Sequence, residues 1–507
     1  MKQLFTDFSG GIDVGSTKLN LGFQTKKVYA QTATNVEIMS NYGIQRMKGN
    51  SLLFSLNTQN DDNNVNYSIN SLFATNDCIL VSIDEGKLYC YNFINSSLTL
   101  LVDSLTKNKK CNFVKYLNGV FITNGFDKPM YFKNSDKSIE VLELKGADEQ
   151  VIIGNAVASF CSRLFVAQGS KLYYSALGNY KDFSTSGDAG YIADFHIDTA
   201  EIVALKPYQE YLAIYKAEQT YLLSGSSPSN YSIMPFSNKG ACSSNACVTV
   251  NNKQYFFSNG LFALSQTGEL NQIVMSSEIS LNIKPMVNEI DFNKKSSIIL
   301  LPYELKNQLW CFVPTKDSNY INNVFVFDYA NSAWVKREIP QNITSACLYN
   351  SRILTGDSLG NVYLEDNGNT FNGEAINFLY QTPFFALGTN SERKTIEEFY
   401  LIMDEEVDNK FIFSCNKDYD DLFESDMEEV EVMSLFSLVW DDDNSHFAIE
   451  ENQTAYNYHD CWSKMFDPKY KLEISESVYS VQICIRGNDL THDFALVGMD
   501  FKEILVD

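Results

Sequence analysis

The glycine-rich string GGIDVGSTK, residues 10–18, is the segment of this chain whose residue types and spacing are best suited to chemistry. Asp13, Gly15 and Thr17 alternate along it, which favours a tight turn. Backbone N–H groups at such a turn bind phosphate and other anions. Phosphate or nucleotide binding is therefore the first hypothesis for this chain.

The same string resembles the first phosphate loop of the actin, hexokinase and sugar-kinase superfamily, in which an Asp-x-Gly-x-Thr turn holds phosphate and metal. That fold also requires a second Asp-x-Gly turn, an adenosine-binding Gly-Gly loop and long crossover helices between strands. The sequence contains none of the three. We therefore interpret residues 10–18 as part of a flexible Gly/Ser arm, and a kinase-like ATPase stays a minor hypothesis.

A second short string, SIDEGKLY (82–89), resembles the Asp-box of sialidase-type propellers, with Tyr89 where that motif has Trp. An Asp-box is a structural hairpin turn and holds no catalytic group. Because Asp and Gly are the residues that tight turns favour, Asp84 and Gly86 are predicted to be turn residues.

The stretch 418–443 is crowded with carboxylates, whose oxygens suit calcium. It lacks the regular Asp-x-Asp-x-Asp-Gly order of a calcium loop, so we expect a solvated face or a charged docking surface. The acids are Asp418, Asp420, Asp421, Glu424, Asp426, Glu428, Glu429, Glu431, Asp441, Asp442 and Asp443.

Constellations of catalytic residues are not apparent in this sequence. No pair of carboxylates stands out for glycoside hydrolysis, and His196 in YIADFHIDT is interpreted as a structural residue. The 11 Cys and four His form no CxxC and no zinc-binding pattern. The sequence therefore predicts no catalytic residue, no cofactor and no metal ligand, and hence a protein that is not an enzyme.

The elements that would position any site come from a strand–turn–strand unit that recurs through most of the chain. In each copy an apolar run precedes a tight polar turn and a second run rich in Tyr and Phe. The centres of the first runs are spaced by 41, 43, 48, 43, 54 and 44 residues. This spacing is typical of β-propeller blades, because one hairpin cannot bury its apolar face and a closed ring can. The seven centres are Leu80, Phe121, Leu164, Leu212, Tyr255, Leu309 and Ile353.

We therefore predict an all-β protein with a propeller of about seven blades at 66–380 and a C-terminal antiparallel β-sandwich at 381–507. Residues 1–65 are predicted to be an arm that docks or supplies closing strands. Six or eight blades stay open as alternatives, because the 54-residue step could contain an insertion and residues 28–56 could form a blade of their own. Two stacked β-sandwiches are a further alternative, because their strands would show the same alternation of apolar and polar residues.

The overall charge limits the partners of this protein. The 507 residues include 39 basic and 63 acidic side chains, for a formal net charge of −24. Tight binding to nucleic acid requires a basic footprint, and none stands out. The scattered cysteines fit assembly in a reduced cytoplasm. The N-terminus lacks the apolar core of a signal peptide, and no apolar stretch is long enough to span a bilayer.

Three blocks of sequence follow the motif order of one family of viral proteins. The first block comprises DFSGGI (7–12), NVEI (35–38) and GIQRMKGN (43–50), and the second covers 162–265. The third comprises FVFDYANSAWVKRE (325–338) and the final FALVGMDFKEI (494–504). Together they resemble the tail nozzle or tail-tube (tubular) proteins of short-tailed bacteriophages. The matching positions of the first block are Phe8, Gly10, Gly11, Asn35, Arg46 and Gly49.

The sequence departs from that family at two places. One is the Asn-rich loop at 57–70, and the other is Met47-Lys48, where the family commonly has Arg-Pro-Gly. The position of the protein within the tail therefore stays open.

The resemblance implies a structural component of the virion tail that is assembled in the host cytoplasm. Its subunits would form a homo-oligomeric ring, a hexamer, below the portal and adaptor, in contact with other tail proteins. Double-stranded DNA would pass through the ring without specific binding, and the net charge of −24 agrees with such a conduit. The alternative is a carbohydrate-binding or depolymerising propeller at the tail tip, where acids and aromatic rings would contact sugars.

Overall fold

The computed structural model describes residues 2–16, 27–57, 67–195, 198–267, 272–388, 391–404, 407–419, 427–432, 438–441, 446–449 and 469–506. Strands dominate these ranges, as predicted, and the helices within them are short. They are α2 (Lys284–Val287) and the 3-10 turns η2 (Pro228–Asn230), η3 (Leu281–Ile283), η4 (Phe292–Ser297) and η5 (Glu304–Lys306). No helix among the described residues is long and apolar enough to cross a membrane.

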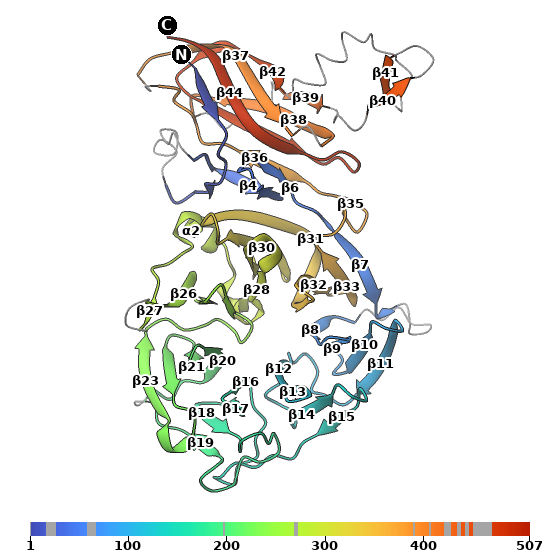
Figure 1. Cartoon of the computed structure of the whole chain (residues 1–507), viewed down its shortest axis with the longest axis vertical. Helices are drawn as coiled ribbons and strands as arrows, with labels where there is room; N and C mark the ends of the chain where they lie inside the picture. The colour runs from blue at the N-terminus through green and yellow to red at the C-terminus, as the bar shows by residue number, and fades with distance from the viewer. Residues whose placement is uncertain are drawn as a thin grey trace.

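Five separate four-stranded antiparallel sheets follow one another along the chain and form the first five blades of a β-propeller (Figure 1). Their strands are β8 (Ile69–Ala74), β9 (Cys78–Ile83), β10 (Leu88–Asn92) and β11 (Ser97–Val102); β12 (Asn112–Tyr116), β13 (Gly119–Thr123), β14 (Met130–Lys133) and β15 (Ile139–Val141); β16 (Ala156–Phe160), β17 (Arg163–Gln168), β18 (Lys171–Tyr174) and β19 (Gly190–Ile192); β20 (Ile202–Tyr208), β21 (Tyr211–Lys216), β22 (Thr220–Ser224) and β23 (Ser232–Ser237); and β24 (Cys247–Val250), β25 (Lys253–Phe257), β26 (Leu261–Gln266) and β27 (Ile273–Met275).

Blades six and seven share one long strand, β31 (Ala333–Tyr349). Its first half is the outer strand of blade six, which also contains β28 (Ile299–Tyr303), β29 (Gln308–Pro314) and β30 (Ile321–Asp328). Its second half is the inner strand of blade seven, beside β32 (Arg352–Asp357) and β33 (Asn361–Glu365). The ring therefore has seven blades, which confirms the predicted architecture in place of six blades, eight blades or stacked sandwiches.

The second strand of each blade is the part of the sequence that carries the repeat signal. All seven centres of the apolar runs lie in second strands: Leu80 in β9, Phe121 in β13, Leu164 in β17, Leu212 in β21, Tyr255 in β25, Leu309 in β29 and Ile353 in β32. These strands are buried almost throughout, whereas the outer strands β11, β15, β23 and β27 contain no buried residue. A second strand is covered by the neighbouring blades on both faces, so its apolar residues are continuous.

The ring is closed by a strand from the N-terminal segment. Strand β7 (Asn50–Ser55) pairs antiparallel with β33 and completes blade seven. The Phe54 ring of β7 stacks on Tyr91 of blade one at a centroid distance of 3.9 Å. Because an unpaired β33 would be an open edge, β7 completes blade seven, and its Phe54 adds to the direct contacts of β31 with blade one, such as Phe93 stacked on Tyr349.

A β-sandwich lies beyond blades six and seven, and both chain termini are in it (Figure 1). One sheet has β42 (Lys469–Val478), β37 (Lys394–Met403) and β44 (Ala495–Val506) together with β1 (Gln3–Phe5), β5 (Val36–Ile38) and β6 (Ile44–Arg46). The other has β36 (Phe378–Gln381), β43 (Val481–Gly487), β38 (Asn409–Lys417) and β39 (Met427–Val432). Phe399 of β37 and Phe413 of β38 meet between the sheets, with ring centroids 6.0 Å apart.

Short strands complete the structure, and one of them joins the two modules. Strand β4 (Thr32–Thr34) pairs with β36 of the sandwich and with β31 of the propeller, so the two sheets are continuous. The remaining strands are β2 (Gly11–Ile12), β3 (Tyr29–Ala30), β34 (Thr370–Phe371), β35 (Glu374–Ala375), β40 (Leu438–Asp441) and β41 (His446–Ile449).

This arrangement differs from a simple division of the chain at residues 65 and 380. Segment 1–65 contributes strands to both modules, and 381–507 shares its sheets with them. The reason is that β44 and β36 alone leave sheet edges open; β1 and β6 cover the edge of β44, and β4 covers the edge of β36. Pairings between distant segments have no local sequence signal.

The closing strand yields a first prediction. We expect Phe54→Ala to lower the free energy of unfolding by roughly 1.5–3 kcal/mol, because it removes a half-buried ring from the contact between the first and last blades. Leu52→Ala on the same strand is the matched control, since Leu52 is 45% exposed. Urea denaturation of both variants measures the difference. Equal midpoints for the two variants would contradict a closing role for β7.

Candidate functional site

The turn at residues 10–16 uses its backbone N–H groups within the protein. Val14 and Gly15 both donate to the carbonyl oxygen of Asn282, each at 2.9 Å. The N–H of Ser16 donates to Asp13 Oδ1, also at 2.9 Å. An anion at this turn would have to displace these acceptors, so the geometry gives no support to the kinase-like hypothesis. Thr17 and Lys18 lie outside the described residues.

The Asp-box-like string is a hairpin turn, as predicted. Gly86 has φ = +79° between β9 and β10, and Asp84 Oδ1 accepts the N–H of Ser68 at 3.1 Å. Both residues therefore form the turn, and Asp84 connects it to the residues before β8.

Most of the acidic stretch 418–443 and His196 lie outside the described residues. The described part includes β39, in which Val430 is buried and Glu429 and Glu431 are exposed near Lys410. This part is a solvated strand face. Within the described ranges, no three His, Cys, Asp or Glu side chains are close enough to hold a metal ion. The ten described cysteines are free thiols.

Segments from the first and third blocks of the viral resemblance converge where the propeller meets the sandwich, whereas the second block lies in blades three to five. We call this region the junction and define it by β4, β5, β6, residues 47–50, the first half of β31, and residues 365–371. Segments from the first and third blocks pair here although they are hundreds of positions apart. The convergence was not predicted, because no periodic pattern connects segments so distant in sequence.

Asn35 and Gly49 show why the junction needs these residue types. Asn35 is buried with φ = +54°, a conformation that asparagine tolerates better than most residues. Its side chain donates to the Asn377 carbonyl and accepts the N–H of Glu338. At Gly49, a Cβ atom would lie 1.8 Å from the carbonyl oxygen of Thr370, so only glycine fits.

The centre of the junction is a fully buried ion pair. Arg337 Nη2 lies 2.7 Å from Glu365 Oε2, and both side chains are completely shielded from solvent. Arg337 also donates to the carbonyl oxygens of Lys48 and Gly49, at 2.6 and 3.1 Å. Glu365 Oε1 accepts from Thr355 at 2.7 Å and from Asn50 at 3.0 Å. The ion pair and its hydrogen bonds therefore connect the beginning of β31 and the end of β33 to residues 48–50 of the N-terminal segment.

Two further ionic contacts attach the sandwich to this centre. Lys306 Nζ lies 2.9 Å from a Glu37 oxygen and 2.8 Å from an Asp366 oxygen. Burial alone would lower the pKa of Lys306, but these two carboxylates outweigh it and raise the pKa above its ordinary value. The Arg46 guanidinium lies 3.0 Å from Asp493, the residue before Phe494. The N-terminal strands therefore contact both modules through buried charges.

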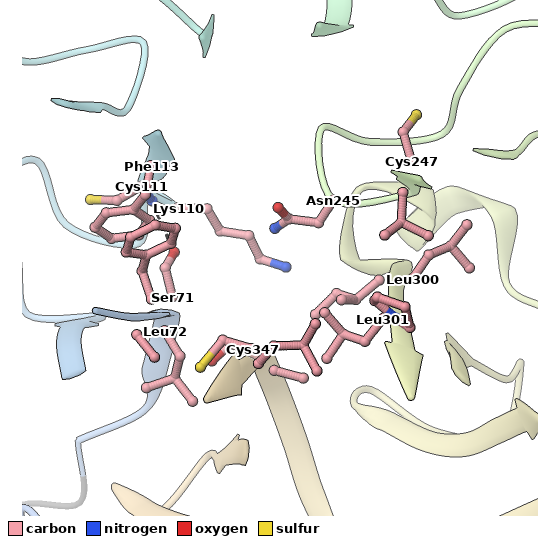
Figure 2. A pocket seen from close by; sticks show the side chains of 18 of the residues that line it. Ser71, Leu72, Lys110, Cys111, Phe113, Asn245, Cys247, Leu300, Leu301 and Cys347 are labelled. Carbon is pink, nitrogen blue, oxygen red and sulfur yellow. Dashed lines mark hydrogen bonds between the residues drawn. The ribbon is translucent and has the colours of Figure 1, made fainter. Parts of the chain in front are cut away.

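A second feature is a cavity of about 320 Å³ at the propeller axis, where the inner strands of the blades meet. Figure 2 shows Lys110 reaching into it from the residues before β12, toward Asn245 on the opposite wall. Lys115 and Lys206 also line it, and the residues that line it include no Asp or Glu. Burial lowers the pKa of Lys110 to about 8 and also lowers the pKa of Lys206. Sequence analysis missed this site because a single Lys before a strand has no distinguishing pattern.

Comparisons with known proteins bear on the fold alone. No family model matches the chain, and no curated protein sequence matches it. Three solved structures are similar to about three fifths of it. They are the computationally designed Ika8 protein (10% identity, TM-score 0.39, 62% of this chain and 99% of that one), the WD40 β-propeller domain of Doa1 (11%, 0.38, 62% and 96%) and virginiamycin B lyase from Staphylococcus aureus (9%, 0.39, 60% and 95%). The assignment of a propeller is therefore based on the strand pairing within this chain.

The buried ion pair yields a second prediction. Glu365→Gln keeps the shape of the side chain but leaves Arg337 as an uncompensated buried charge. We expect it to lower the free energy of unfolding by about 3–5 kcal/mol. Glu143→Gln is the matched control, because the Glu143–Lys128 pair is largely exposed and such pairs contribute little. Urea denaturation compares the two, and equal stability would show that the junction does not depend on this pair.

Proposed function

We propose that this protein is a structural component of the tail of a short-tailed bacteriophage, a nozzle or tube subunit that lines or gates the genome-ejection channel. The observation that carries the proposal is the junction, in which the first and third blocks of viral resemblance meet. Asn35 of the first block accepts the N–H of Glu338 of the third block, although the two residues are 303 positions apart. Residues of the first and third blocks therefore contact each other where the two modules meet.

A rigid two-module subunit suits this mechanical role. During ejection a tail ring must keep its shape while the genome passes. Continuous sheet pairing through β4 and the ion pair between Lys306 of the propeller and Glu37 of β5 in the sandwich resist bending between the modules. The net charge of −24 supports passage of DNA without adhesion.

The partners of such a subunit are other structural proteins. We propose that copies of this chain form a six-fold ring below the portal and adaptor, and that the ring is assembled in the host cytoplasm before it enters the virion tail. Contacts that close into a ring are made between two different surfaces of neighbouring copies. The proposal includes no enzymatic activity, cofactor or metal.

A polar groove favours a second candidate, the carbohydrate-binding or depolymerising propeller at a tail tip. The groove has a volume of about 360 Å³ and lies beside the junction. Amide and carboxylate side chains of Asn322, Asn323, Glu338 and Glu374 line it, and the buried Asn323 Oδ1 has no hydrogen-bond partner. Such groups can bind sugar hydroxyls. However, the aromatic ring in the lining, Phe371, is 2% exposed and offers no open stacking face.

Electron microscopy of purified virions of the phage that encodes this chain tests the proposal, together with mass spectrometry of their proteins. We expect the chain in the particles, with six toroidal densities arranged around the DNA axis below the portal. A stable monomer that is absent from virions would reject the structural role. Release of sugars from host capsule by the purified protein would favour the second candidate.

A further inference from the structure

The axial cavity has the charge and size of a small-molecule site. Its volume of about 320 Å³ lies within the usual range of roughly 300–1,000 Å³ for ligand pockets. The charged side chains that line it, Lys110, Lys115 and Lys206, are all cationic. The chain as a whole carries a net charge of −24, so the cavity has the opposite sign to the rest of the molecule.

Lys110 and Asn245 are the polar groups that face each other across this cavity (Figure 2). Neither side chain has a hydrogen-bond or ion-pair partner among the described residues. A cation in a poorly solvated cavity is unfavourable unless an anion or hydrogen bonds compensate it. A ligand oxygen between the two side chains would accept from both the ammonium and the amide.

A hydrogen bond crosses the propeller axis, and part of the cavity wall is apolar. The Ser244 hydroxyl donates to the Asn112 side chain, which joins the beginnings of blades five and two across the axis. Leu72, Leu300 and Leu301 form part of the wall. An occupant must therefore be a compact molecule, and the apolar wall would accommodate a short carbon skeleton.

We propose that this cavity binds a small anion that carries a phosphate or carboxylate group, with Lys110 as its main cationic ligand and Asn245 as a hydrogen-bond donor. The cavity is lined by residues of one chain, so the proposal is independent of the tail role. A phosphate ester and a polycarboxylate share this chemistry, and the experiment separates them.

Titration calorimetry of the full chain with inorganic phosphate, with citrate and with sulfate tests the site. We expect saturable binding of one anion per chain, and the tighter of phosphate and citrate identifies the preferred group. Lys110→Met should weaken binding at least tenfold, and Asn245→Ala several-fold. Lys253→Met is the matched control, because Lys253 is an exposed lysine in the β24–β25 turn, and it should leave the affinity unchanged.

A pH series with sulfate, whose charge is constant over this range, tests whether a lysine of lowered pKa holds the anion; comparison with Lys110→Met and Lys206→Met assigns it. Lys110 is charged below a pKa of about 8 and neutral above it, so affinity should fall at least tenfold between pH 7 and pH 9.5. The other titratable groups on the walls are Lys115, Lys206, Cys111, Cys247 and Cys347. Burial raises the pKa of each of these thiols, so the thiols stay neutral at pH 7. The fall begins near the pKa of the free chain, and the higher pKa in the anion complex sets only the pH at which the fall levels off.

Three outcomes would overturn the proposal. These are the absence of saturable binding for all three anions, equal binding by Lys110→Met and the unmodified chain, and equal loss in Lys253→Met. Circular dichroism checks folding, and Lys110→Met should melt no lower than the unmodified chain because it removes an unpaired cation. If Lys110→Met does not fold, the anion affinities of Asn245→Ala and Lys206→Met are measured instead. Unchanged affinity in both variants would reject the site.

Discussion

The buried ion pair between Arg337 and Glu365 is the constraint on which the arrangement of both modules depends. Each charge is acceptable inside the protein only while its partner and hydrogen bonds are in place. Those partners come from β31, from the end of β33 and from residues 48–50 of the N-terminal segment. The propeller therefore cannot close without bringing the N-terminal segment into register. The same segment continues through β4 and β6 into the sandwich.

We expect the N-terminal segment to become ordered last during folding, because its partners lie far away in the sequence. Strand β7 pairs with residues about 310 positions later, and β1 pairs with the end of β44. Contacts of such sequence separation require most of the chain to be organised first, since closing a long loop costs entropy before any contact is gained. The blades themselves are local hairpin units. We infer that the blades form first and that the junction then fixes their closure and the position of the sandwich.

The sequence predicts the local part of this structure well and the non-local part poorly. Markers such as Leu80 and Leu309 lie in the second strands because these strands are covered on both faces, which imposes an apolar run that can be recognised. The partners of β1, β4 and β6 have no such signal, because a three-residue strand at a sheet edge needs no particular pattern. Asn35 and Gly49 were noted as matches to a family, and their physical reasons, a left-handed conformation and a close backbone approach, required coordinates. The axial lysines were missed for the same reason.

The claim that the N-terminal strands unite two modules into one cooperative block has a direct test. Hydrogen exchange of the full chain, followed by mass spectrometry over increasing urea, measures the protection of peptides from β7, the propeller second strands and β44. The account predicts that all three lose protection in one step at the same urea concentration. Loss of β7 protection well before the others, or separate steps for propeller and sandwich, would contradict it.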